Sequence, residues 1–202
     1  ITTTTVDYSG GANDGIEPGE AGTLIGTPAV VDKFGDYDVT EKFQANLLCN
    51  ATYWDFNQLE QDPGYQCGDP IDEIHVNYLD CLCGEDGWDN PSGSGREEPL
   101  EAALMALCRS VEEPPDVCYE SGSPFGSGDV GANAGFLRDD SAIFVVIVGD
   151  EGDDSRKMQM GDEDPEPYLD AFAEFERRIK FVTVGPNIIP NESGTGYSMP
   201  CN

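Results

Sequence analysis

The stretch that decides the fold is Ala142-Ile-Phe-Val-Val-Ile-Val148, followed directly by Gly149-Asp-Glu-Gly-Asp-Asp-Ser155. Seven apolar residues without polar alternation are typical of a central strand that is buried on both faces by helices. The acidic residues then come at the carboxyl end of that strand. In sheets of parallel strands, ligands bind beyond the carboxyl ends. The stretch therefore predicts both a buried parallel sheet and the edge at which a site would lie.

On the C-terminal side, a helix is predicted from near Asp164, with Pro165 at its first position, to the basic residues that end at Lys180. The strand Phe181–Val184 follows. The apolar stripe of this helix is formed by Tyr168, Phe172, Phe175 and Ile179. A strand, a helix and a second strand in this order predict a parallel βαβ unit.

On the N-terminal side, a helix is predicted over Glu97–Arg109, with acidic residues at its start and Pro114-Pro115 after its end. Its buried stripe is formed by Leu100, Leu104 and Leu107. A further helix is predicted over Asp38–Leu48, where Asp38 can cap the first turn. The apolar face of that helix is formed by Val39, Phe43 and Leu47.

The rest of the N-terminal half predicts little regular structure. The β-branched run Ile1–Val6 favours a strand, and Thr27–Lys33 is at best a short edge strand because it contains Pro28. The segment from Asn50 to Arg96 is rich in Cys, Gly, Asp and Asn, which indicates a long loop elaboration held by disulfides. Residues 1–202 are therefore interpreted as a single α/β domain with a mostly parallel sheet and helices on both faces.

The charge of the chain excludes several classes of partner. Ten basic residues against 40 acidic ones give a formal net charge of −30. Binding to nucleic acid needs a basic surface, so it is excluded, and anionic membrane surfaces are disfavoured. No apolar run is long enough to insert into a membrane. Such a charge destabilises a compact state unless bound divalent cations or external salt compensate it, and both indicate a location outside the cytoplasm.

Seven cysteines favour disulfides and an oxidising compartment, because their spacing fits no zinc site. Cys108 and Cys118 are the best local pair. Cys81 and Cys83 are expected to pair with Cys49 and Cys67, in an order that the sequence leaves open. The odd number leaves one cysteine free or paired outside this chain.

Two interpretations fit the acidic segment after the central strand. Four carboxylates in Asp150-Glu-Gly-Asp-Asp154, followed by a hydroxyl, are the oxygen ligands that Mg²⁺ and Ca²⁺ prefer. The alternative is a solvated acidic turn, which is common in so acidic a chain. His75 is the only histidine, and it alternates with Ile74 and Val76 as in a strand. That pattern favours a structural histidine over a general base.

The region Phe136–Ser155 resembles the central-strand region of von Willebrand factor A-like domains, most closely a secreted form in bacterial surface proteins of the myxobacterial type. Glu97–Leu107 is similar to the helix after the second metal loop of that family. Ile1–Asp7 resembles its second strand, and Phe181–Pro186 its penultimate one. The resemblance covers about two thirds of the chain and implies a Rossmann-like, three-layer α/β fold.

The resemblance also implies a metal site. The family binds a divalent cation with an Asp-x-Ser-x-Ser motif, a threonine from a second loop and an aspartate from a third. Asp150 matches the third-loop aspartate, and Ser94 falls near the threonine position. The neighbouring ligand candidates are Glu151, Asp153 and Asp154. The Asp-x-Ser-x-Ser motif itself is not present, and Asp7-Tyr-Ser-Gly-Gly11 is a near match without the last serine. The first strand and its motif are therefore expected to be missing from this chain, supplied by another segment, or lost.

The resemblance implies a non-catalytic adhesion or assembly module, extracellular or at the cell surface. It would bind a protein partner or a neighbouring subunit, with Mg²⁺ or Ca²⁺ near Asp150. The alternative is a structural subunit of a surface or filament assembly without a working metal site, in which a neighbour completes an unpaired sheet edge. A secreted hydrolase is the weakest alternative, because the sequence shows no recognisable nucleophile arrangement.

Overall fold

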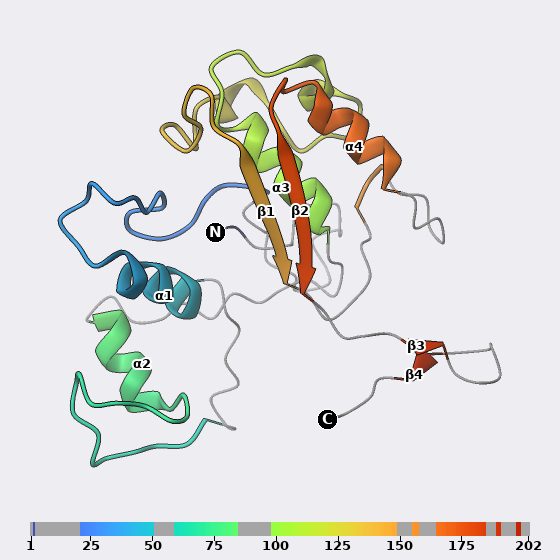
Figure 1. Ribbon diagram of the computed structural model, residues 1–202. Coiled ribbons are helices and arrows are strands. Elements are labelled where there is room, and N and C mark those ends of the chain that lie inside the picture. Colours follow the sequence, from blue (N-terminus) through green and yellow to red (C-terminus); the bar gives the residue numbers. More distant parts are fainter. Residues whose placement is uncertain are drawn as a thin grey trace.

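The computed structural model describes residues 2, 21–50, 59–84, 98–148, 155–157, 165–184, 189–190 and 197–198 (Figure 1). The N-terminal half contains the helices α1 (Val39–Asn50) and α2 (Val76–Cys83). Next come α3 (Pro99–Cys108) and the 3₁₀ turns η2 (Asp116–Tyr119) and η3 (Ser127–Asp129). The chain continues with β1 (Ile143–Val148), α4 (Glu166–Ala173) and β2 (Ile179–Val184). The short strands β3 (Ile189–Pro190) and β4 (Tyr197–Ser198) come last.

The predicted βαβ unit is confirmed. β1 and β2 pair in parallel, in a register that runs from Ile143 opposite Ile179 to Val148 opposite Val184. Helix α4 lies between them in the chain, as the crossover of a parallel pair requires. β3 and β4 form a separate antiparallel pair that the sequence did not predict. The α/β class is therefore shown, with a two-stranded parallel sheet at its centre.

The hydrophobic core lies between this sheet and the helices α3 and α4. Helix α3 is buried on nearly all sides, and it lies behind the two strands in Figure 1. From α4, the Phe172 ring packs on Phe181 of β2, with their centroids 4.8 Å apart. Ile143 and Val145 of β1 face the same core. Both helices thus cover one face of the sheet, which is where the apolar stripe predicted for Tyr168 and Phe172 is buried.

The opposite face of the sheet is exposed, so the prediction that the central strand is buried on both faces is wrong. Side chains alternate across a strand, and the outward ones here are large and apolar. This open sheet face consists of Phe144, Val146, Val148, Val182 and Val184, between 41% and 69% exposed. Among the described residues, no helix covers it, and the second helical layer of the expected three-layer fold is not seen there.

Helix α1 confirms the predicted N-terminus but not the predicted face. The Asp38 carboxylate accepts a hydrogen bond from the backbone N–H of Glu41 at 2.9 Å, as a helix cap does. The expected buried stripe points outward, however, since Val39, Phe43 and Leu47 are 39% to 50% exposed. The buried positions are Asn46 and Cys49. The inner side of α1 is therefore fixed by the hydrogen bonds of Asn46 and by the disulfide of Cys49 rather than by its apolar stripe.

The edge strand expected over Thr27–Lys33 is not formed, because that segment consists of turns and bends. The side chain of Asn46 takes the place of a strand partner. Its amide oxygen accepts from the Thr27 N–H at 3.3 Å, and its amide nitrogen donates to the Pro28 carbonyl at 2.8 Å. One buried side chain thus satisfies the backbone groups that a neighbouring strand would have satisfied.

The strand predicted around His75 is also wrong. His75 is instead the N-cap of α2, which lies within the segment predicted to be a long loop. Its backbone is extended, and its Nδ1 accepts a hydrogen bond from the Tyr78 N–H at 3.1 Å. The ring also lies edge-on to Tyr65, with centroids 4.7 Å apart. The role of His75 is structural, as expected, although the element is a helix.

The helix predicted from Asp164 to Lys180 ends at Ala173, and β2 begins earlier than expected, at Ile179. Ile179 therefore belongs to the strand rather than to the helical stripe. Glu176 adopts a left-handed backbone conformation with φ +53°, which turns the chain between the two elements. Three basic residues follow this turn at the start of β2: Arg177, Arg178 and Lys180.

Three disulfides are present among the described residues. Cys108–Cys118 is the pair predicted from the sequence. The other two disulfides are Cys49–Cys83 and Cys67–Cys81, so the pairing that the sequence left open among these four cysteines is now known. Cys201, as well as the predicted strand Ile1–Val6 apart from Thr2, falls outside the described residues. The disulfides are compatible with an oxidising, extracellular location.

None of the described helices has the length and apolar character needed to span a membrane.

Candidate functional site

The candidate site is the junction between the start of α3 and residues 155–157, which follow the acidic segment after β1. Ser155 is fully buried, and its Oγ accepts a hydrogen bond from the backbone N–H of Glu101 at 3.0 Å. That N–H belongs to the first turn of α3, where helix geometry provides no internal acceptor. The N-cap position is held by Glu98, which is not one of the short residues that favour it. A serine 54 positions away thus caps the helix.

A buried carboxylate stands beside this cap. Glu101 is 1% exposed, and both of its oxygens are engaged. The Tyr168 hydroxyl of α4 donates to Oε2, and the Arg156 guanidinium donates to Oε1 from Nε at 3.4 Å and from Nη2 at 3.3 Å. A buried charge without such partners would be strongly destabilising. Glu101 therefore joins α3, α4 and the segment after β1 at one point.

Tyr168 is held as a neutral donor. Its ring is fully buried, and its oxygen also accepts from the Lys157 backbone N–H at 3.1 Å. Burial and the neighbouring charge of Glu101 raise the pKa of Tyr168 far above its ordinary value. The proton therefore stays on the phenol at every physiological pH, and the hydrogen bond to Glu101 persists.

Each of residues 155–157 is anchored by its own contact. Besides Glu101, Arg156 donates from Nη1 to the Ser121 carbonyl at 3.1 Å. The Lys157 ammonium pairs with Glu120. The described chain resumes at Ser155 after the end of β1 at Val148. The six residues between them are thus attached to the fold at both ends, at the carboxyl end of a parallel strand where ligand sites form.

The predicted metal ligands lie in the two segments that lead into this junction. Asp150, Glu151, Asp153 and Asp154 precede Ser155, while Ser94 precedes the buried Glu98 by four positions. All five residues fall outside the described ranges. The Ser155–Glu101 contact joins the end of the first segment to the helix that follows the second. The positions of the five ligands themselves are not described. Among the described residues, no group of three or more His, Cys, Asp or Glu side chains is arranged to hold a metal ion.

The network around Glu101 was not predicted from the sequence. The sequence places Glu101 among the acidic residues that the helix dipole favours at a helix start, and Tyr168 in the apolar stripe of the next helix. A signal was present in the spacing, because Glu101 shares its helix face with Leu104 and Cys108, three and seven residues later, and both are buried. A carboxylate on a buried face requires a buried cation or donor. Arg156 could be suspected as that partner only once its place in the fold was known.

A second polar cluster lies at the other end of α3. Asn133, which is buried, donates from Nδ2 to the Gly22 carbonyl at 2.9 Å and to the Ala106 carbonyl at 3.1 Å. Its Oδ1 accepts from the Leu24 N–H at 2.9 Å. Gly22 has φ +80°, and a Cβ there would lie 2.5 Å from the Ala106 nitrogen, so only glycine fits. These contacts fix residues 21–24 against α3.

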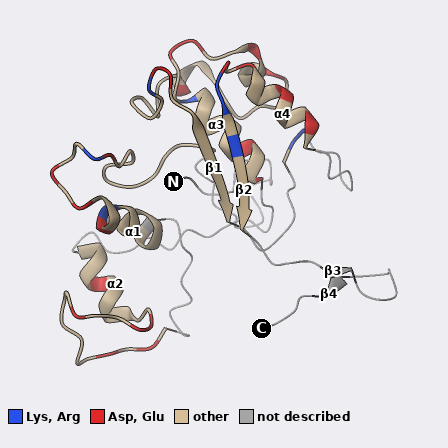
Figure 2. Ribbon diagram, viewed as in Figure 1, with Lys and Arg blue, Asp and Glu red and all other residues tan. Residues whose placement is uncertain are grey.

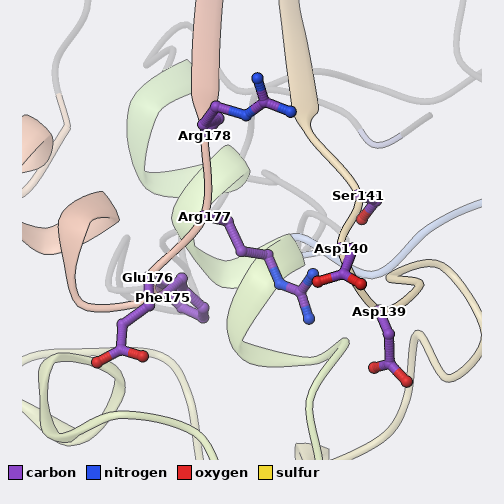
Figure 3. Close-up of a pocket in the computed structure, with 7 residues that line it drawn as sticks. All are labelled: Asp139, Asp140, Ser141, Phe175, Glu176, Arg177 and Arg178. Atoms are coloured by element: carbon purple, nitrogen blue, oxygen red, sulfur yellow. The ribbon is translucent and has the colours of Figure 1, made fainter.

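A surface hollow lies at the amino ends of β1 and β2, away from the junction (Figure 3). Its rim carries both signs of charge, with Arg177 directed toward the turn that contains Asp140. The Arg177 guanidinium donates to the Arg138 carbonyl at 2.9 Å. The full lining is Asp139, Asp140, Ser141, Phe175, Glu176, Arg177 and Arg178. Mixed charges of this kind select neither an anion nor a cation.

Comparisons with known proteins leave the resemblance as a prediction. No protein-family model, curated protein or solved structure matches the chain. The α/β class therefore stands on the βαβ unit of the structure alone.

Proposed function

We propose that the protein is an extracellular, non-catalytic adhesion or assembly module that binds a protein partner through Mg²⁺ or Ca²⁺ held near Asp150. The observation that carries the proposal is the hydrogen bond between Ser155 and Glu101. It attaches the end of the acidic segment to the start of the helix that follows Ser94. The proposed ligands are Asp150, Ser94, Glu151, Asp153 and Asp154.

The physical basis of partner binding is the coordination preference of hard cations. Ca²⁺ and Mg²⁺ take six or more oxygen ligands, and positions that the protein leaves open are filled by water or by another oxygen donor. A carboxylate of the partner is such a donor, and it also compensates the charge of the ion. An acidic segment fixed at both ends limits the conformational entropy that cation binding would cost.

The test is a comparison of Asp150→Asn with Asp139→Asn. Both substitutions remove one negative charge, but Asp139 is exposed at the opposite end of β1. Calorimetric titration and thermal melts are carried out in MgCl₂, CaCl₂ and NaCl at equal ionic strength, so that screening is the same. A specific site raises the melting temperature with the divalent salt above the value in NaCl, because a ligand of the native state stabilises it.

The expected result is that Asp150→Asn removes this additional rise and lowers cation affinity at least about tenfold, whereas Asp139→Asn keeps both. Equal cation affinity in the two variants would exclude Asp150 as a ligand. An identical response to NaCl and to the divalent salts in the wild-type protein would exclude the site altogether.

The second candidate function is that of a structural subunit in a surface or filament assembly, without a working metal site. The observation that favours it is the open sheet face together with the sheet edges. Within the described residues, β1 and β2 each have only one neighbouring strand. Exposed apolar faces and strand edges are features that other chains cover in assemblies. Cation dependence separates this function from the first.

A further inference from the structure

The three described disulfides differ in how far solvent can reach their cysteines. Cys67–Cys81 contains no buried cysteine, because Cys67 is exposed and Cys81 is half-buried. The other two disulfides each contain at least one buried cysteine, since Cys108 and Cys118 are 0% exposed and Cys49 is 4% exposed. Exchange with an external thiol requires that its thiolate reach one of the two sulfurs. Access therefore distinguishes Cys67–Cys81 from the other two.

A tight turn presents Cys67 to solvent. The Gln66 carbonyl accepts a hydrogen bond from the Asp69 N–H at 2.9 Å, and the Asp69 carboxylate accepts one from the Gln66 N–H at 3.1 Å. Gly68 lies within the turn with φ +97°, a conformation that favours glycine. Because these bonds join residues only three positions apart, the turn is expected to persist after the disulfide opens.

The segment that precedes α2 is held against this helix by contacts other than the disulfide. The Asp62 N–H donates to Asn77 Oδ1 at 2.9 Å. The Tyr65 ring lies edge-on to His75 and to Tyr78, with centroids 4.7 and 6.2 Å apart. These contacts are expected to keep the two cysteines close to one another after reduction. The same disulfide can then form again without exchange among the other cysteines.

The surroundings of this disulfide are uniformly acidic. Residues 59–84 contain no Lys or Arg, and Figure 2 shows acidic residues along α2 and the segment before it. The acidic residues are Glu60, Asp62, Asp69, Asp72, Glu73 and Asp80. The attacking thiolate is an anion, so this negative field disfavours a thiol that carries further negative charge. A neutral or cationic thiol is therefore the class that the site accepts best.

We propose that Cys67–Cys81 is a thiol-exchange site, at which a small neutral or cationic thiol opens the disulfide reversibly while the rest of the molecule stays folded. The thiolate bonds to the Cys67 sulfur, and the electron pair of the broken S–S bond stays on the Cys81 sulfur, which takes up a proton. A second thiol then attacks the mixed disulfide and releases Cys67 as a thiol. Two external thiols are thereby oxidised to one disulfide, and the protein disulfide is reduced to two thiols. The site depends neither on the cation site nor on assembly.

The test is differential alkylation of the folded protein. Any free thiol is first blocked with N-ethylmaleimide, and the excess reagent is removed. The protein is then incubated with a low concentration of dithiothreitol, a neutral dithiol, and samples taken over time are labelled with iodoacetamide and mapped by peptide mass spectrometry. We expect Cys67 and Cys81 to be labelled together, at least about tenfold faster than the other four paired cysteines. Equal labelling of all six, or earlier labelling of Cys49 and Cys83, would overturn the proposal.

Two controls show whether the selectivity belongs to the fold. In denaturant, the three disulfides should be reduced at similar rates, because the fold no longer shields any of them. In the folded protein, hydrogen exchange should become faster near α2 after reduction but stay unchanged in α3. Faster exchange in α3 would mean that the disulfide opens only when the whole molecule unfolds, and it would also overturn the proposal.

The charge preference is tested with two further probes, cysteamine and 2-mercaptoethanesulfonate. Added NaCl screens the negative field, so it should slow reduction by cationic cysteamine and accelerate reduction by the anionic sulfonate. The same salt dependence for both probes would exclude the charge preference.

Reversibility is tested with Tyr65→Ala and its matched control Tyr65→Phe. After dithiothreitol is removed, the wild-type protein and Tyr65→Phe should form Cys67–Cys81 again. Tyr65→Ala loses the ring contacts with His75 and Tyr78, so it should do so at least about twofold more slowly. Formation of other cysteine pairs in the wild-type protein would show that the site is not reversible.

Discussion

Glu101 shows how a single side chain can determine where two segments of this chain meet. Its backbone N–H takes its cap from Ser155, and its carboxylate is shared between Arg156 and Tyr168. The helix spacing of Glu101 already indicates a buried carboxylate, but its partners come from residues more than fifty positions away. Sequence patterns report on neighbours along one element, so they predict that a partner is needed without identifying it.

We expect Arg156→Gln to lower the free energy of unfolding by about 2 kcal/mol, because it leaves the charge of Glu101 without its cation. The loss is moderate because Arg156 is about a quarter exposed, so water replaces part of the interaction. Urea unfolding monitored by circular dichroism measures the difference. Arg138→Gln is the matched control, since it removes the same charge from an exposed position. Equal midpoints for the two variants would contradict the prediction.

We expect stability to fall steeply above about pH 10 because of Tyr168. The raised pKa of Tyr168 in the native state means that only the unfolded chain loses this proton there. The free energy of unfolding then decreases by about 1.4 kcal/mol per pH unit, while below pH 10 Tyr168 adds no pH dependence. Tyr168→Phe should remove this part of the slope, and Tyr119→Phe, at an exposed position, should keep it. Identical slopes in the two variants would show that Tyr168 ionises equally in both states.

At the scale of elements, apolar periodicity predicted where α1 begins, but it did not predict which face of α1 is buried. The start of α1 at Asp38 is confirmed, yet its apolar stripe is exposed. Periodicity identifies a face that could be buried, but the disulfide and Asn46 decide which face is. At His75, alternation over three residues was too short to distinguish a strand from a helix cap.

The pair α1 and α2 should respond to loss of its disulfide separately from the core. Replacing Cys49 and Cys83 by alanine opens a loop of 34 residues, which we expect to destabilise the pair by about 4 kcal/mol. Hydrogen exchange should become faster in α1 and α2 but not in β1, because the core cluster contains residues of neither helix. Replacing Cys67 and Cys81, a loop of 14 residues, is the control, with an expected loss of about 3 kcal/mol. Equal acceleration in β1 would mean that the molecule unfolds as one unit.

At the scale of the whole molecule, the parallel unit β1–α4–β2 could be predicted because β1 is strongly apolar and Pro165 marks the start of α4. The second helical layer was also predicted from the apolar run of β1, but the outward face of the sheet is exposed. A run such as Phe144–Val148 indicates that both faces avoid water, but it does not indicate which chain supplies the cover. The candidate site could likewise be predicted only in part. Its location at the end of β1 follows from topology, whereas its supporting network depends on packing.

The hydrogen bonds of Asn133 have a consequence for the order in which the molecule folds. Asn133 contacts Gly22 and Leu24, which are 111 and 109 residues away in the chain. Contacts of such separation carry a large loop-closure entropy and form slowly unless other contacts shorten the loop first. Residues 21–24 are therefore expected to dock last, onto an α3 surface that is already assembled. During synthesis, residues 21–24 would leave the ribosome more than one hundred residues before Asn133, and they could reach their native place only after it.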